Sequence, residues 1–297
     1  MRAVITGAAG FVGRHLAVHL GSMGDDVVSV DRDHDVTDTD DITSVLKSAM
    51  PDVVYHLAAL SHVGASWGDP SDVLRVNVLG TSSVLAAART AAPETLVVVV
   101  SSAEVYGVVT PAELPLGEEA ELRPATPYAA SKAAAELVAL QAWRGYAQRV
   151  VVARPFNHIG PGQAPTFLVP ALAKRLVEAR ATRTSEVPTG ALVTRRDFTD
   201  VRDVVRAYRL LAERGQPGTV YNICSGVDVA ISDVAARLVE LIFPAATLFE
   251  DPALRRPVDI PVLRGDPSRL RAATGWAPAI TLDQTLRDVA AESGAAS

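Results

Sequence analysis

The chain has a single cysteine, Cys224, so it cannot form an internal disulfide bond. Such sparse cysteine usage is typical of proteins in a reducing cytoplasm, and we expect that location. Cys224 falls within a predicted strand, where a buried and unreactive thiol is expected.

Long apolar runs and concentrated positive charge are also missing. Apolar residues make up 48% of the chain, but no uninterrupted run approaches the ~20 residues that a membrane-spanning helix needs. The chain enters an apolar strand almost at once, so no signal peptide is expected. The net charge is −6 with no basic block, so nucleic acid is not an expected partner. The six histidines lack the spacing of metal ligands, so no metal is expected.

A short strand followed by closely spaced glycines opens the chain. The run Arg2–Thr6 predicts a buried parallel strand, and Gly7, Gly10 and Gly13 follow it around the start of a helical pattern at Phe11. Such a turn presents backbone N–H groups and the positive end of a helix to a phosphate. The spacing is GxxGxxG rather than the commoner GxGxxG, and a plain glycine-rich turn is the alternative interpretation.

Asp31 strengthens the dinucleotide interpretation. A second apolar run, Val27–Val30, ends at Asp31, about 20 residues after the loop, where a carboxylate binds the adenosine ribose hydroxyls. The sequence therefore predicts a dinucleotide site.

Strand-like runs and helical patterns alternate through the first half of the chain. Further strands are predicted at Val53–Leu57, Thr95–Val100 and Val150–Ala153, and helices at Asp40–Ala49, Asp72–Ala91 and Tyr128–Tyr146. This alternation predicts an α/β fold with a Rossmann-like, doubly wound parallel sheet.

The pattern changes after Arg154, where a loop rich in Gly and Pro begins. Helices are predicted at Val169–Ala179, Asp203–Arg214 and Ser232–Phe243, a strand at Thr219–Cys224, and irregular structure at Glu186–Asp200. We expect residues 1–160 to form the NAD(P)-binding domain, with 198–226 returning to it. Residues 161–197 and 227–297 are expected to form a smaller mixed α/β substrate-binding lobe.

Three side chains point to proton-transfer chemistry. Ser102 follows the valine-rich strand, and Tyr128 and Lys132 are four residues apart, hence on one face of a helix. An ammonium beside a phenol favours the phenolate, so we expect Lys132 to lower the pKa of Tyr128 from about 10. Such a tyrosine exchanges a proton with a hydroxyl or carbonyl that Ser102 can hydrogen-bond. The alternative interpretation of this pair is ordinary helix surface.

Longer motifs carry a family resemblance. They include TGAAGFVG from Thr6, HLAA from His56, SSAEVYG from Ser101, YAASK from Tyr128 and RPFNHIGPGQ from Arg154. With them the chain resembles the extended short-chain dehydrogenase/reductase superfamily, whose members modify nucleotide sugars. It is most similar to the branch with the GDP-4-keto-6-deoxy-D-mannose reductases and the GDP-mannose 4,6-dehydratases.

The resemblance implies roles for individual residues. Ser102, Tyr128, Lys132 and Glu104 would be catalytic. The residues that would bind the cofactor are Gly7, Gly10, Phe11, Val12, Gly13, Asp31, Arg32, Asp35, Val36, Leu57, Ala58, Ala59, Asn77, Tyr128, Lys132, Pro155 and Phe156. The residues that would contact the substrate are Ser61, His62, Ser102, Glu104, Asn157, Val169, Arg196 and Arg256.

Two of these assignments have alternatives. Arg196 and Arg256 would grip the substrate diphosphate, because guanidinium groups match phosphate oxygens, but they could also be solubilising surface residues. Glu104 is placed where sugar dehydratases have a catalytic glutamate, and reductases of this branch also carry an acidic residue nearby. A structural role for Glu104 is equally compatible.

The resemblance implies a reductase acting on the C4 keto group of GDP-4-keto-6-deoxy-D-mannose, which would form GDP-rhamnose. A 4,6-dehydratase or 4-epimerase with recycled NAD is the alternative, and a non-catalytic dinucleotide-sensing protein is an alternative of another class. Asp31 would repel a 2′-phosphate and Arg32 would attract one, so NAD(H) is favoured and NADP(H) is possible.

Small side chains on two predicted helices indicate self-association. The segments Asp72–Ala91 and Tyr128–Tyr146 are rich in Ala, Ser and Gly. We expect them to pack against their symmetry mates in a homodimer.

Overall fold

A six-stranded sheet organises the molecule. The computed structural model describes residues 1–254, 258 and 260–295. All neighbours in the sheet are parallel, and their order is β2-β1-β3-β4-β5-β9. The strands are β1 (Arg2–Thr6), β2 (Asp26–Val30), β3 (Val53–His56), β4 (Leu96–Val100), β5 (Val150–Pro155) and β9 (Val220–Ile223). The expected doubly wound α/β fold is confirmed.

Helices cover both faces of this sheet. Because successive side chains of a strand point to opposite faces, Ile5 joins an apolar cluster with Leu16 of α1 (Phe11–Ser22), whereas Val4 joins one with Leu46 of α2 (Thr39–Ala49). The first face also carries α7 (Val201–Arg214) and α9 (Ser268–Thr274), and the second carries α4 (Gly80–Ala91) and α5 (Pro127–Tyr146).

Capping residues set the start of the helix that carries Tyr128. Thr126 accepts a hydrogen bond from the N–H of Ala129 at 3.1 Å, and Pro127 occupies the first turn. A side-chain cap satisfies an otherwise free N–H, and proline there lacks only an N–H that the helix does not use. The local sequence therefore fixes where α5 begins.

The helix expected at Asp72–Ala91 contains an irregular segment. It consists of α3 (Pro70–Leu74), a π-helical turn over Arg75–Leu79 and α4. Within that turn, Asn77 accepts from the N–H of Leu60 at 2.8 Å and donates to its carbonyl at 3.1 Å. Inserted turns of this type occur often at functional sites, and this one holds the segment that follows β3.

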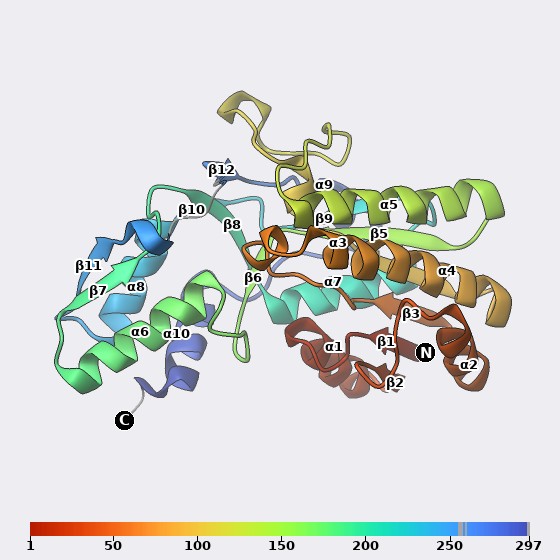
Figure 1. Ribbon diagram of the computed structural model, residues 1–297, viewed down its shortest axis with the longest axis horizontal. Helices are drawn as coiled ribbons and strands as arrows, with labels where there is room; N and C mark the ends of the chain where they lie inside the picture. The colour runs from red at the N-terminus through yellow and green to blue at the C-terminus, as the bar shows by residue number, and fades with distance from the viewer. Residues whose placement is uncertain (255–257, 259, 296–297) are drawn as a thin grey trace.

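The second half of the chain builds a separate apolar core. It contains α6 (Leu168–Thr182), α8 (Ile231–Ile242) and α10 (Leu282–Ala290), whose apolar faces share one cluster. In Figure 1 these helices lie at the end of the molecule opposite to α2 and α4. The short helical turns are η1 (Ala65–Trp67), η3 (Ala103–Tyr106), η4 (Pro111–Glu113), η5 (Pro252–Leu254) and η6 (Ala291–Ala295).

The expectation of irregular structure at Glu186–Asp200 is wrong. The segment forms β7 (Glu186–Thr189) and β8 (Arg195–Asp200). β7 pairs with β11 (Thr247–Glu250), while β8 pairs with β6 (Asn157–Ile159), β10 (Asp228–Ala230) and β12 (Val262–Leu263). All of these partners are remote in sequence, since even β8 and β10 are separated by α7 and β9, so local propensity did not reveal the strands.

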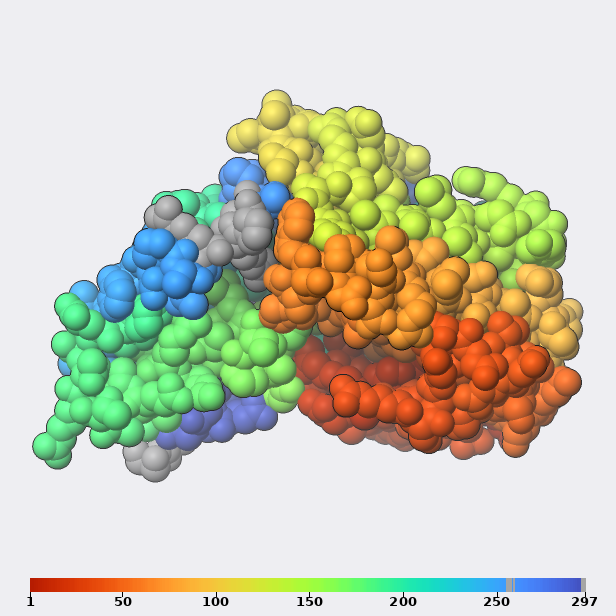
Figure 2. Space-filling model, viewed as in Figure 1, coloured from red at the N-terminus to blue at the C-terminus, as the bar shows by residue number. Residues whose placement is uncertain are grey.

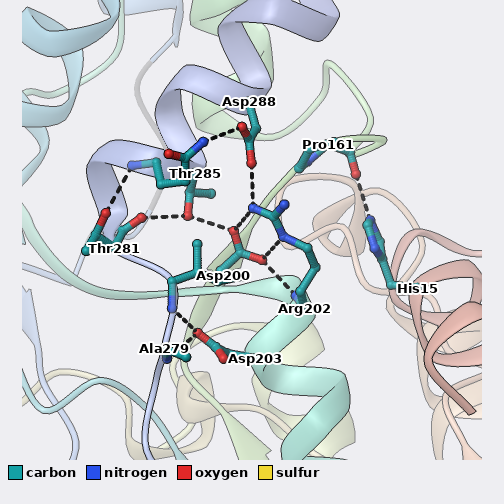
Figure 3. A network of polar contacts seen from close by, with 11 residues as sticks. His15, Pro161, Asp200, Arg202, Asp203, Ala279, Thr281, Thr285 and Asp288 are labelled. Atoms are coloured by element: carbon teal, nitrogen blue, oxygen red, sulfur yellow. Dashed lines mark hydrogen bonds and ion pairs between the residues drawn. The ribbon is translucent and has the colours of Figure 1, made fainter. Parts of the chain in front are cut away.

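A polar network joins the start of α7 to α10. The Asp200 carboxylate caps α7 and accepts from Arg202 and from the Thr285 hydroxyl, the latter at 2.7 Å (Figure 3). Arg202 also donates to Asp288 at 2.7 Å. Burial opposes the charge on Asp200, but the hydrogen bonds from Arg202 and Thr285 outweigh it, so the pKa of Asp200 lies below its ordinary value.

Among the described residues, no helix has the length and apolar character needed to cross a membrane.

Replacing Thr285 with Val tests this junction. The change preserves the shape of the side chain but removes the hydroxyl that donates to the buried Asp200 carboxylate. We expect the free energy of unfolding in urea at pH 7 to fall by about 1–3 kcal/mol. Thr90→Val is the matched control, because Thr90 is exposed and donates only to the Ala86 carbonyl of its own helix. Equal losses in the two variants would contradict the network's contribution.

Candidate active site

A cleft of about 1430 Å³ lies where the parallel strands end. It is lined by residues that directly follow five strands, namely Gly7 after β1, Asp31 after β2, Leu57 after β3, Ser101 after β4 and Phe156 after β5. In the space-filling view a recess separates the red and orange N-terminal residues from the green lobe (Figure 2). Ligands of open α/β sheets bind at this edge.

The glycine loop forms a cradle with no room for side chains. Gly7 has φ +73°, and a Cβ at Gly13 would lie 2.2 Å from the Gly7 carbonyl oxygen. No side chain caps the start of α1 at Gly10, and no acidic residue lies in its first turn. The first N–H groups of α1 are therefore available to an anionic group, and the cradle fits the pyrophosphate of a dinucleotide.

Asp31 is tied to this loop. One carboxylate oxygen of Asp31 accepts from the N–H of Ala9 at 2.7 Å, and the other accepts from the N–H of Arg32 at 3.0 Å. Asp35 accepts from the backbone and hydroxyl of Thr37, and these bonds lower the pKa of Asp35. The other expected cofactor residues that line the cleft are Gly10, Phe11, Val12, Gly13, Arg32, Val36, Leu57, Ala58, Ala59, Pro155 and Phe156.

Asn77 is the expected cofactor residue that does not line the cleft. Its side chain is 1% exposed and bonds with Leu60 and with the Ser131 hydroxyl at 2.8 Å. Asn77 thus links the segment after β3 to α5 and would act on a cofactor only through that segment.

Ser102, Tyr128 and Lys132 come together in the cleft. Tyr128 and Lys132 are buried side chains of α5, and Ser102 precedes η3. Ser102 acts on Tyr128 in the direction of a lower pKa, and the Ser102 hydroxyl oxygen accepts from the N–H of Glu104 at 3.2 Å. Lys132 donates to the Val100 carbonyl at 2.8 Å.

The expected direction of the Tyr128 pKa is wrong. Burial raises the pKa of Tyr128 to about 12, and this effect exceeds the lowering by Ser102, while the negative charge of Glu104 raises it further. The ammonium of Lys132 is directed to a backbone carbonyl instead. Burial also lowers the pKa of Lys132 to about 8, although Glu136 raises it. Desolvation therefore disfavours the charged form of both groups.

Five more of the expected substrate residues line the cleft, namely Ser61, His62, Asn157, Val169 and Arg196. Glu104 lines it beside Tyr128. His62 accepts from the N–H of Ala65 at 2.9 Å and packs edge-on against Phe167. Arg196 is buried and donates to the carbonyls of Arg195 and Ile260, so its surface interpretation does not apply. Arg256 lies outside the described residues.

Several lining residues were not expected from the sequence. His158 stacks on Phe11, donates from Nδ1 to the Phe156 carbonyl at 3.0 Å, and has a pKa lowered by burial. Tyr208 reaches the cleft from α7, and Gln163 and Arg175 line it from the second lobe. His158 lies inside the RPFNHIGPGQ motif that begins at Arg154, and this motif was the sequence feature that could have indicated His158 as a site residue.

The glycine cradle, the open helix start and the Ser–Tyr–Lys trio define a Rossmann-type enzyme with a cleft suited to a nicotinamide dinucleotide. A family described as "NAD dependent epimerase/dehydratase family" matches residues 3–224. The chain belongs to this family, which confirms the resemblance to the extended short-chain dehydrogenase/reductase superfamily.

Comparisons with individual proteins agree with this assignment. The chain is 36% identical to the GDP-6-deoxy-D-mannose reductase of Pseudomonas aeruginosa over 97% of this chain and 95% of that protein. It is similar to the structure of RMD from Pseudomonas aeruginosa complexed with NADPH, with a TM-score of 0.90, 34% identity and 99% of each chain covered. The UDP-glucose 4-epimerase of Thermus thermophilus in complex with NAD gives a TM-score of 0.88 at 27% identity over 100% of both chains.

Replacing Gly13 with Ala tests the cradle. The new methyl group would force apart backbone atoms of Gly7 and Ala8, so we expect NADH and NADPH to bind at least about tenfold more weakly, or ~1.4 kcal/mol. Fluorescence titration measures this affinity.

Gly21→Ala is the matched control, because Gly21 lies in the same helix and a Cβ there meets nothing within 4 Å. This control should bind the cofactor normally and stabilise the helix by up to ~1 kcal/mol. Normal binding by the Gly13 variant would rule out the cradle as the pyrophosphate site.

Proposed function

We propose that the protein is an NAD(P)H-dependent nucleotide-sugar reductase that reduces the C4 keto group of GDP-4-keto-6-deoxy-D-mannose to give GDP-rhamnose. The observation that carries this proposal is the meeting of Ser102, Tyr128 and Lys132 beside the glycine cradle. The similarity to the Pseudomonas aeruginosa reductase over nearly the whole chain supports the choice of substrate.

Each of the three residues has one task in this reaction. Bound NAD(P)H supplies the hydride that C4 receives. Ser102 hydrogen-bonds the C4 oxygen and orients the carbonyl. Tyr128 donates its phenolic proton to that oxygen as negative charge develops there, which completes the alcohol. Lys132 binds the nicotinamide ribose.

The protonation state of Tyr128 is compatible with the proposed reduction. Burial raises the pKa of Tyr128 to about 12, so the phenol holds its proton at neutral pH. Reduction needs a proton donor at this position. The similarity to the Pseudomonas aeruginosa reductase, rather than this pKa, favours a reductase over a dehydratase or epimerase.

A 4,6-dehydratase or 4-epimerase is the second candidate, because Glu104 lines the cleft close to Tyr128. Both would recycle a bound NAD and consume none. A non-catalytic dinucleotide-sensing protein is disfavoured by the presence of all three proton-transfer residues.

The decisive experiment follows NADH or NADPH oxidation after addition of GDP-4-keto-6-deoxy-D-mannose. We expect stoichiometric consumption by the wild type, and a loss of about 10²–10⁴-fold in kcat for Tyr128→Phe with little change in cofactor affinity. No turnover of this sugar would remove the substrate assignment, and a fully active Tyr128→Phe variant would remove the mechanism. Tightly bound NAD with no net consumption would favour the second candidate.

The same assay compares the two cofactors. Asp31 faces the glycine loop and opposes a 2′-phosphate, whereas the neighbouring Arg32 lines the cleft and attracts one. The structures most similar to this chain include one complexed with NADPH and one with NAD. NAD(H) remains favoured and NADP(H) possible.

We further infer that residues 1–160 together with 198–226 form the cofactor-binding domain, and that 161–197 and 227–297 form the substrate-binding lobe. The pairing of β9 with β5 and the separate apolar core of α6, α8 and α10 support this division. Two features depart from these bounds. β8 belongs to the small sheet, so the return to the large sheet begins at Val201, and α9 packs against the large sheet although it falls within 227–297. A cytoplasmic location stays a prediction from the single cysteine.

A homodimer through α4 and α5 is also proposed. The two helices contact each other, and exposed apolar side chains lie at this surface, namely Leu79 at the end of the π-helical turn before α4 and Leu137 in α5. We expect a dimer by sedimentation velocity at micromolar concentration, and a monomer for Leu137→Arg, which places a charge in the interface. Val18→Arg on α1 is the matched control and should remain dimeric. A monomeric wild type would refute this arrangement.

A further inference from the structure

Arg154 is a buried cation behind the proposed catalytic residues. It lies in β5, is 4% exposed, and forms a two-point ion pair with Glu136 at 2.5 and 2.9 Å. A further nitrogen donates to the Tyr106 hydroxyl at 2.9 Å and to the Glu118 carbonyl at 3.0 Å. All three nitrogens of the planar guanidinium therefore donate hydrogen bonds.

The partners of Arg154 belong to the elements that carry the proton-transfer residues. Glu136 is one helical turn after Lys132 in α5, and Tyr106 is in the same short turn as Glu104. Tyr106 also donates to Asn222 of β9 at 2.7 Å. The residues directly after Arg154 are Pro155 and Phe156, which line the cleft.

We propose that the Arg154–Glu136 pair is a positioning device that fixes α5, η3 and the end of β5 relative to one another, and that the Glu136 carboxylate, buried one helical turn from Lys132, acts on the Lys132 ammonium through its negative charge. This inference rests on the proposed function in one respect, namely that the Lys132 ammonium binds the cofactor. Arg154 and Glu136 act through Lys132 and do not line the cleft.

The groups around Lys132 explain why Glu136 matters. Val100 of β4 accepts from the ammonium, and His56 of β3 is neutral because burial and the charge of Lys132 lower the pKa of His56 to about 3. Tyr128 on the same helix is held in its neutral form by burial. Glu136 is the group that raises the pKa of Lys132 against its burial. Arg154 in turn keeps the buried Glu136 carboxylate paired.

Glu136→Gln removes this negative charge while preserving the shape of the side chain. In the wild type, NADH affinity should fall as pH rises through about 8, where Lys132 loses its proton. An ammonium group that loses a neighbouring negative charge releases its proton at lower pH. We therefore expect the midpoint of this fall to move down by about 1 pH unit in Glu136→Gln. NADH fluorescence titrations from pH 6 to 10 measure it.

Two further variants separate electrostatics from folding. Glu136→Asp retains the charge and should keep the midpoint near that of the wild type. The double variant Arg154→Met/Glu136→Leu replaces the pair by apolar side chains, which should recover stability lost in Arg154→Met alone. Its midpoint should nevertheless stay lowered, because Glu136 is absent, and this variant decides the question if Glu136→Gln does not fold.

Asp25→Asn is the matched control for breaking a buried ion pair. Asp25 pairs with Arg209 at 2.7 Å and with the N-terminal amine, in a region remote from α5. This variant should lose stability but keep the wild-type midpoint. An unchanged midpoint in Glu136→Gln or in the double variant, or an equal shift in Asp25→Asn, would overturn the inference. The titration needs only cofactor, so a failure to reduce the ketosugar would count against the proposed substrate alone.

Discussion

Parallel hydrogen bonding between β1, β3, β4 and β5 is the constraint on which the site depends. Its register places Thr6 beside His56, His56 beside Val99, and Val100 beside Ala153. All four strands therefore end at one edge, and the residues that follow them meet there. The glycine cradle, Ser102 and Pro155 are far apart in sequence, and this shared edge makes them neighbours.

Burial decides the chemistry at that edge. Tyr128 and Lys132 are buried, which raises the pKa of the phenol and lowers that of the ammonium. A neutral phenol is a proton donor, and this property suits the reduction of a carbonyl. The remaining charge on Lys132 depends on nearby partners, of which Glu136 is held in place by Arg154. Glu136 and Arg154 thus stabilise the site without contacting a ligand.

Elements with strong local signals were predictable. The valine-rich strands, the glycine loop and the capped start of α5 follow from residues that are adjacent in sequence. Glu186–Asp200 was mispredicted because β7 and β8 are short and obtain their hydrogen bonds from β6, β10, β11 and β12. The π-helical turn over Arg75–Leu79 was also missed. Its anchor, Asn77, bonds to Leu60 and Ser131, which lie on other elements.

The sequence alone determined the class of this protein. The spacing of glycines after a buried strand and the four-residue interval between Tyr128 and Lys132 express local backbone geometry, which needs no distant contact. Only the tertiary structure decided the direction of the Tyr128 pKa, the burial of Arg196 and the partners of Arg154. These properties arise from desolvation and from pairs of residues far apart in the chain. Neither is encoded in the spacing of neighbouring residues, because both depend on what the folded chain packs around them.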